Sequence, residues 1–219
     1  FFCFDEEQGH RAGEATANGV LKLDREIAEA VKADGAKAAL GFGFLDSQQA
    51  FYDGYSLNAS EGEWAKRRYL DPFTPVIAGA EVRRARRDMN QALLNRFNIA
   101  FDLNFHGSQL KDYPHIAEYG RRIKALRERY AAELWNAAFV ERQGAQVNGP
   151  DLSYSVFAGR NGKRAVVVVN MGTERASKAE VTLPGASAMA YASPEDPAQK
   201  TFGGSVEIAP QSAVVIFEK

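Results

Sequence analysis

Hydrophobic and polar positions follow two different periods along this chain, and the period changes near residue 142. Before that point, short apolar runs alternate with stretches in which apolar residues recur every three to four positions, the spacing of an amphipathic helix. The pattern over residues 82–97, for example, places Ala85, Met89, Leu93 and Phe97 on one inner face of a helix. The β-α alternation occurs four times and predicts a parallel sheet with crossover helices.

The predicted elements of this first part are separated by glycines and polar residues. Its strands are predicted at Phe1–Asp5 and over residues 38–44, 74–80 and 98–107. Its helices are predicted over residues 22–34, 82–97 and 114–140, and Gly35 stands where the C-terminal cap of the first helix belongs.

Beyond the polar stretch of residues 142–151, short alternating runs replace the helical period. The segments LSYSVFAG and RAVVVVN, joined by RNGK, predict a hairpin in which Asn161-Gly162 suits a type I′ turn. Further strands are predicted over residues 179–183, 189–192, 205–208 and 213–217. This part of the chain therefore reads as an antiparallel all-β domain.

The composition narrows the function classes. Hydrophobic residues make up 45% of the 219 residues and charged residues 25%, which is typical of a globular protein with a sizeable core. The net charge of −1 argues against nucleic acid as a partner, and the longest apolar runs are too short to cross a bilayer. Cys3 is the only cysteine, and neither HExxH nor GxSxG occurs, so we expect no metal and no cofactor.

Three segments carry a resemblance to known enzymes. VVVVNMGTERASKAEVTLPG (residues 166–185) and EIAPQSAVVIFEK (residues 207–219) resemble the terminal β-domains of glycoside hydrolases. EGEWAKRRYLDPFTPVIAG (residues 61–79) resembles a late segment of their TIM barrels. The order of β-α units followed by a β-domain is similar to the C-terminal half of enzymes of the α-amylase and α-galactosidase groups.

This resemblance implies an α/β fold class with four β-α units of a partial TIM barrel over residues 1–142 and a small antiparallel β-sandwich over residues 152–219. Eight units close such a barrel, so four leave two strand edges bare. Phe1–Asp5 would then be a middle strand of the barrel. The expected partners are a carbohydrate substrate and either an upstream barrel half or a second chain that completes the sheet.

Residues just past the C-terminal ends of barrel strands line one shared pocket. In this sequence those positions are occupied by acids, histidines and other polar residues: Asp5, Glu6, Glu7, His10, Asp46, Tyr52, Asp53, Glu81, Asn104 and His106. Converging carboxylates are what glycoside hydrolysis requires, one as the acid and one as the nucleophile or base. The catalytic candidates are Asp46 or Asp53 as proton donor and Asp5 or Glu6 as its partner. The substrate-binding candidates are His10, Tyr52, Glu81, Asn104 and His106.

Other interpretations of the same residues stay open. Acids after strands often serve as helix caps or keep loops solvated, and the run of arginines over residues 83–87 reads as the solvated face of a helix. Trp135 reads as a packing residue. At the level of the whole chain, the alternatives are a non-catalytic carbohydrate-binding or assembly module, and a different α/β enzyme with a β appendage.

Overall fold

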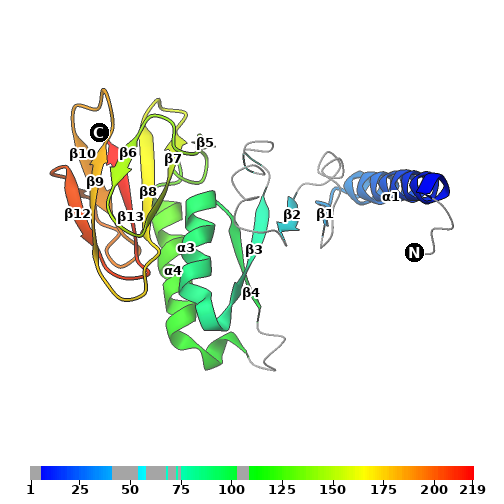
Figure 1. Cartoon of the computed structure of the whole chain (residues 1–219), viewed down its shortest axis with the longest axis horizontal. Coiled ribbons are helices and arrows are strands. Elements are labelled where there is room, and N and C mark those ends of the chain that lie inside the picture. The colour runs from blue at the N-terminus through cyan, green and yellow to red at the C-terminus, as the bar shows by residue number, and fades with distance from the viewer. Residues whose placement is uncertain (1–5, 41–53, 58–67, 69–72, 74, 103–108) are drawn as a thin grey trace. The chain divides into compact units, whose positions relative to one another are not determined.

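The computed structural model describes residues 6–40, 54–57, 68, 73, 75–102 and 109–219 (Figure 1). The chain divides into two compact units, Phe1–Asn58 and Ala59–Lys219, and each is described by itself. Three α-helices lie within the described residues, together with parallel and antiparallel strand pairs. The fold is therefore mixed α and β, although the four predicted β-α units are not all seen in the described part.

The described part of the first unit contains one long helix and one pair of short strands. Helix α1 (Glu6–Ala33) ends at Gly35, whose φ of +77° and N–H bond to the Lys32 carbonyl (2.9 Å) confirm the predicted C-terminal cap. Strand β1 (Ala39–Leu40) pairs in parallel with β2 (Gly54–Leu57). The strand predicted at Phe1–Asp5 lies outside the described residues, as does most of the one predicted over residues 38–44.

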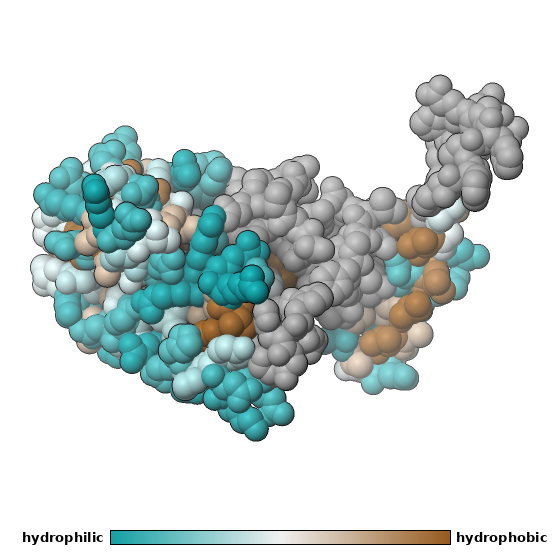
Figure 2. Space-filling model, turned by 60° about the horizontal axis from the view of Figure 1, so that its bottom comes forward, coloured by the Kyte–Doolittle hydropathy of each residue, from teal (hydrophilic) through white to brown (hydrophobic). Residues whose placement is uncertain are grey.

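Helix α1 begins well before the predicted start at Lys22. The segment that was expected to form an acidic loop, with Glu6, Glu7 and His10, is the first part of this helix. Glycine inside a helix costs only about 1 kcal/mol, so glycines 9, 13 and 19 do not prevent the helix from forming among the alanine and glutamate residues around them. Farther along, Val20, Leu23 and Ile27 form an exposed apolar row, which Figure 2 shows as a hydrophobic band.

The second unit opens with a β-α-β segment, as predicted. Strand β3 (Val76–Glu81) and strand β4 (Asn98–Asp102) are parallel and in register from Ile77 opposite Asn98 to Glu81 opposite Asp102. A short 3-10 helix, η2 (Val82–Arg84), and α3 (Ala85–Asn95) connect them. The predicted inner face of the helix is confirmed, because all four of its residues are buried in the core.

Helix α4 is shorter than the sequence suggested. After the 3-10 helix η4 (Leu110–Asp112), α4 runs over Pro114–Arg129, with its proline in the first turn, and does not reach Val140. The chain leaves the helix at Tyr130, whose ψ of 40° is not helical. It then forms β5 (Ala138–Phe139), which pairs with β7. The apolar residues between Tyr130 and Val140, whose spacing led to the longer predicted helix, lie in turns and in the edge strand β5.

The remaining residues form two antiparallel sheets. One has the strand order β11-β10-β13-β8-β7-β5 and the other β12-β9-β6. Their bounds are β6 (Gln146–Asn148), β7 (Leu152–Ala158), β8 (Arg164–Asn170), β9 (Ser177–Thr182), β10 (Met189–Ala192), β11 (Lys200–Thr201), β12 (Ser205–Ile208) and β13 (Ala213–Glu218). No α-helix occurs in residues 130–219, all of which are described, and the predicted strands are all present.

The β7–β8 hairpin forms, but its predicted type I′ turn is wrong. A type I′ turn needs positive φ at both central residues, and in this turn only Gly162 has it, at +78°. The Gly162 N–H donates to the Gly159 carbonyl (3.0 Å), and the Gly159 N–H donates to the Lys163 carbonyl (2.8 Å). This pattern is a three-residue loop that closes with glycine in the left-handed conformation.

The large sheet is packed on both faces. Val166 and Val168 of β8 face a cluster shared with the small sheet, whereas Val167 and Val169 face a cluster shared with α3 and α4. In Figure 1 the two helices accordingly lie between the β3–β4 pair and the sandwich. Strand β8 is therefore apolar along nearly its whole length rather than alternating.

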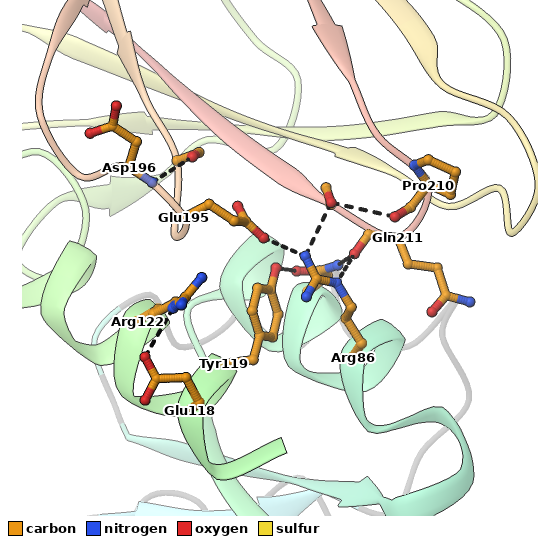
Figure 3. Close-up of polar contacts among 11 residues, drawn as sticks. Arg86, Glu118, Tyr119, Arg122, Glu195, Asp196, Pro210 and Gln211 are labelled. Atoms are coloured by element: carbon orange, nitrogen blue, oxygen red, sulfur yellow. Dashed lines mark hydrogen bonds and ion pairs between the residues drawn. The ribbon is translucent and has the colours of Figure 1, made fainter. Parts of the chain in front are cut away.

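A polar network ties the helices to the sandwich (Figure 3). The Arg86 guanidinium donates to the Gln211 carbonyl (2.7 Å) and to Ser212 Oγ (3.1 Å), forms an ion pair with Glu195, and lies 3.9 Å from the centre of the Tyr119 ring. The Tyr119 hydroxyl donates to Asn90 Oδ1 (2.5 Å), and burial raises the pKa of this hydroxyl. The arginine run of α3 is therefore not wholly solvated, because Arg86 faces the sandwich.

Candidate functional site

The candidate site lies at the carboxyl end of β3. Alternate residues of this strand, Val76, Ala78 and Ala80, are buried on the side of the helices, whereas Gly79 is exposed on the other side. Glu81 ends the strand on the same side as Gly79, and its side chain is 46% exposed. This is the position at which a parallel sheet presents side chains to a ligand.

Two neighbours hold Glu81 in place. Arg84 Nε lies 3.1 Å from Glu81 Oε2 and 3.4 Å from Asp88 Oδ2, so one guanidinium bridges two carboxylates. The Glu81 backbone N–H donates to Asp88 Oδ2 (2.9 Å). Burial raises the pKa of Asp88, and the Glu81 N–H and Arg84 oppose that rise. The arrangement combines an exposed carboxylate, Glu81, with a partly buried one, Asp88, whose pKa is raised by burial.

The register adds a second acidic position beside the first. Asp102, the last residue of β4, is the partner of Glu81 in the parallel pair. The carboxyl end of the parallel pair therefore has an acidic residue on each of its two strands. Glu81 was predicted from the sequence, whereas Asp88 and Arg84 were not. Their spacing of four residues at the start of a helix that directly follows a strand was the available signal.

Only some of the other candidate residues lie in the described part of the chain. Glu6 and His10 lie in α1 rather than in a loop after a strand. Six other candidates fall outside the described residues: Asp5, Asp46, Tyr52, Asp53, Asn104 and His106. The structure therefore brings Glu81 together with Arg84 and Asp88, and the convergence of the remaining candidates stays a prediction.

A groove of about 510 Å³ runs between β4 and α4. Its apolar lining includes Ile99, Phe101 and Trp135, and Lys124 and Arg127 contribute positive charge. On the far side of β4, no strand of the described residues pairs with it. The groove thus follows an open sheet edge, where unpaired backbone groups and apolar side chains favour a further strand.

Arg127 is buried, with 9% of its surface exposed, and caps the end of α3 by donating to the carbonyls of Ala92 (2.7 Å) and Phe97 (2.8 Å). Burial and the nearby guanidiniums of Arg68 and Arg96 lower the pKa of Arg127 to about 9. Because helix C-termini carry unsatisfied carbonyls and partial negative charge, these contacts stabilise the helix end. These three arginines, Arg68, Arg96 and Arg127, lie near the amino end of β4, away from Glu81.

In the described part of the chain, no group of three or more histidine, cysteine, aspartate or glutamate residues has the geometry to hold a metal ion. None of the described helices is long and apolar enough to span a membrane.

Solved structures resemble this chain, although no protein-family model matches it and no curated protein matches its sequence. One is a GH27 β-L-arabinopyranosidase from Geobacillus stearothermophilus, with a TM-score of 0.55, 10% identity and 90% of this chain covered. A variant of that enzyme in complex with arabinose gives a TM-score of 0.54, 13% identity and the same coverage. The chain has the fold of part of this enzyme. It spans 53% and 54% of the two matched chains, about half their length.

Proposed function

We propose that this chain is the C-terminal part of a larger glycosidase and that it takes part in hydrolysis of glycosidic bonds. Its first part would supply four β-α units of a TIM barrel, and its second part would be the terminal β-sandwich. The observation that carries the proposal is the position of Glu81. It ends a parallel strand, is held by Arg84 and Asp88, and belongs to a fold that resembles a glycosidase.

The proposed roles follow from the requirements of the reaction. An acid must protonate the leaving oxygen while a second carboxylate acts as nucleophile or base. Asp46 or Asp53 is the proposed donor, with Asp5 or Glu6 as its partner. Glu81 would accept hydrogen bonds from substrate hydroxyls, since Arg84 holds its half-exposed carboxylate at the end of β3. The other proposed contacts with the sugar are His10, Tyr52, Asn104 and His106.

The groove along β4 supports the proposed partner. Its apolar lining and the open edge of the sheet fit a parallel strand followed by a helix, which is the unit that an upstream barrel half or a second chain would add. The complete active site would then form only after this addition, because half a barrel provides only half of the strand ends.

The test measures release of 4-nitrophenol from a panel of aryl glycosides, including the β-L-arabinopyranoside, by the protein that contains residues 1–219. Asp46→Asn, Asp53→Asn and Glu81→Gln are compared with the wild type and with Asp112→Asn, an exposed control. We expect the donor substitution to lower turnover by about 10²–10⁴ and only one of the two aspartates to show this loss. Glu81→Gln should chiefly raise KM.

Two results would contradict the proposal. If all three variants cleave glycosides like the wild type, these residues are caps or solvated acids. If the wild type cleaves nothing in the panel yet binds sugars, the non-catalytic carbohydrate-binding alternative replaces hydrolysis.

A further inference from the structure

A second pocket lies at the opposite end of the β3–β4 pair from Glu81. It has a volume of about 830 Å³ and is lined by Phe73, Ala132, Trp135, Asn136, Arg160 and Asn161. Phe73 precedes β3, whereas the residues numbered 132–136 follow α4 and the other two belong to the β7–β8 turn. Its lining therefore combines two aromatic rings with amide and guanidinium groups.

Both rings rest on buried arginines. The Arg96 guanidinium lies 5.2 Å from the centre of the Phe73 ring, and the Arg127 guanidinium lies 5.1 Å from the Trp135 ring. Arg96 donates to the carbonyls of Trp135 (3.1 Å) and Ala137 (2.6 Å), so it contacts both aromatic residues at once. Each ring is thus in contact with a guanidinium that is itself anchored to backbone carbonyls.

Arg96 adopts an unusual backbone conformation to do this. Its φ of 55° and ψ of 44° are left-handed, a conformation that glycine usually supplies at the end of a helix. Strained residues of this kind often occur where a side chain must be held in a particular place. Here the guanidinium lies against the ring of Phe73, a residue that is itself 54% exposed to solvent.

From this geometry we propose that the pocket is a saccharide-binding site, with Phe73 and Trp135 as the stacking surface and Asn136 and Arg160 as hydrogen-bonding groups for hydroxyls. One face of a sugar ring presents C–H groups that pack on an aromatic ring, while its edge presents hydroxyls that need polar partners. A fixed aromatic surface loses little conformational entropy on binding. The site does not depend on hydrolysis at Glu81.

The proposal is tested by affinity electrophoresis of the protein that contains residues 1–219, in gels that contain soluble arabinogalactan, galactomannan or xylan. We expect at least one of these polysaccharides to retard the wild type. Trp135→Ala should weaken the affinity at least about tenfold, as loss of a central aromatic contact commonly does. Phe73→Leu keeps apolar volume but removes the flat ring, and should weaken binding as well. Trp135→Phe should keep part of the affinity.

Two comparisons make the result decisive. Arg160→Ala alters an exposed side chain and should weaken binding without unfolding the chain, whereas Glu180→Ala on β9 should have no effect. Because the substituted pocket residues lie at the opposite end of the β3–β4 pair from Glu81, their effect on binding separates this site from the proposed catalytic one. The proposal would be overturned if none of the three polysaccharides retarded the wild type. It would also be overturned if Trp135→Ala and Phe73→Leu were retarded as strongly as the wild type.

Discussion

Replacement of Asn170 tests how the sandwich is held together. This side chain is fully buried at the end of β8. Its Nδ2 donates to the carbonyls of Arg175 (2.8 Å) and Ile208 (3.0 Å), and its Oδ1 accepts from the Gly172 N–H (2.9 Å). One amide therefore fixes the loop after β8 and joins it to the end of β12. Asn170→Ala removes all three hydrogen bonds, while Asn170→Asp keeps the size and the acceptor but removes both donors.

The expected losses follow from these bonds. At about 1 kcal/mol each, the three bonds are worth about 3 kcal/mol of unfolding free energy, which corresponds to a fall of about 6–12 °C in Tm for a unit of this size. Asn170→Asp should lose at least about 2 kcal/mol at neutral pH, because a carboxylate would face two carbonyls. It should recover partly at low pH, where the protonated acid donates one bond.

Urea unfolding followed by circular dichroism gives both numbers. Asn148→Ala and Asn148→Asp are the matched controls, since Asn148 is exposed on β6, and each should change the unfolding free energy by less than about 0.5 kcal/mol. If Asn170→Asp unfolds at the same urea concentration as the wild type, the three hydrogen bonds do not carry the stability assigned to them.

Two further predictions concern pH. Glu218 makes a two-pronged contact with Arg164 (2.9 and 3.0 Å), and the Arg164 hydrogen bonds lower the pKa of Glu218. Its contribution to stability is therefore present above pH 4.5 and is lost as the pH falls through the lowered pKa. Glu218→Gln should lower the Tm at pH 7. In a pH series of thermal melts, the Tm of this variant should fall less steeply below pH 4.5 than that of the wild type. Burial instead raises the pKa of Asp88, so this carboxylate costs stability above its folded pKa and the cost disappears on acidification. The Tm difference between Asp88→Asn and the wild type should therefore favour the variant more at pH 7 than at pH 3. An equal Tm difference at both pH values in the same melts would contradict burial as the cause.

Sequence pattern was most informative where a residue's environment depends on its near neighbours. The buried face of α3 and the strands after residue 151 other than the two-residue β11 were predicted because alternation and helical spacing are local signals. The end of α4 at Arg129 was not, since the apolar residues beyond it pack in turns and in β5 at nearly helical spacing. The start of α1 was missed because its glycines resemble turn signals.

The candidate site shows a similar division. Glu81 was predicted because it directly follows an apolar strand. Its contacts with Arg84 and Asp88 depend on how α3 folds back over the end of β3, and the arginine run hid them by suggesting a uniform solvated surface. The burial of Arg96 and Arg127 could not be predicted from the sequence either. Nothing in their sequence neighbourhood indicates that backbone carbonyls from distant segments would surround them.

The two-sided burial of β8 has a consequence for how the second unit unfolds. Val166 and Val168 belong to one hydrophobic cluster and Val167 and Val169 to the other, so every residue of this run is a shared boundary between them. Removal of α3 and α4 would leave one whole face of the large sheet in water, and removal of the small sheet would do the same to the other face. Disruption of either cluster therefore removes residues of β8 against which the other cluster packs. The helical layer and the sandwich should lose their structure in a single cooperative step.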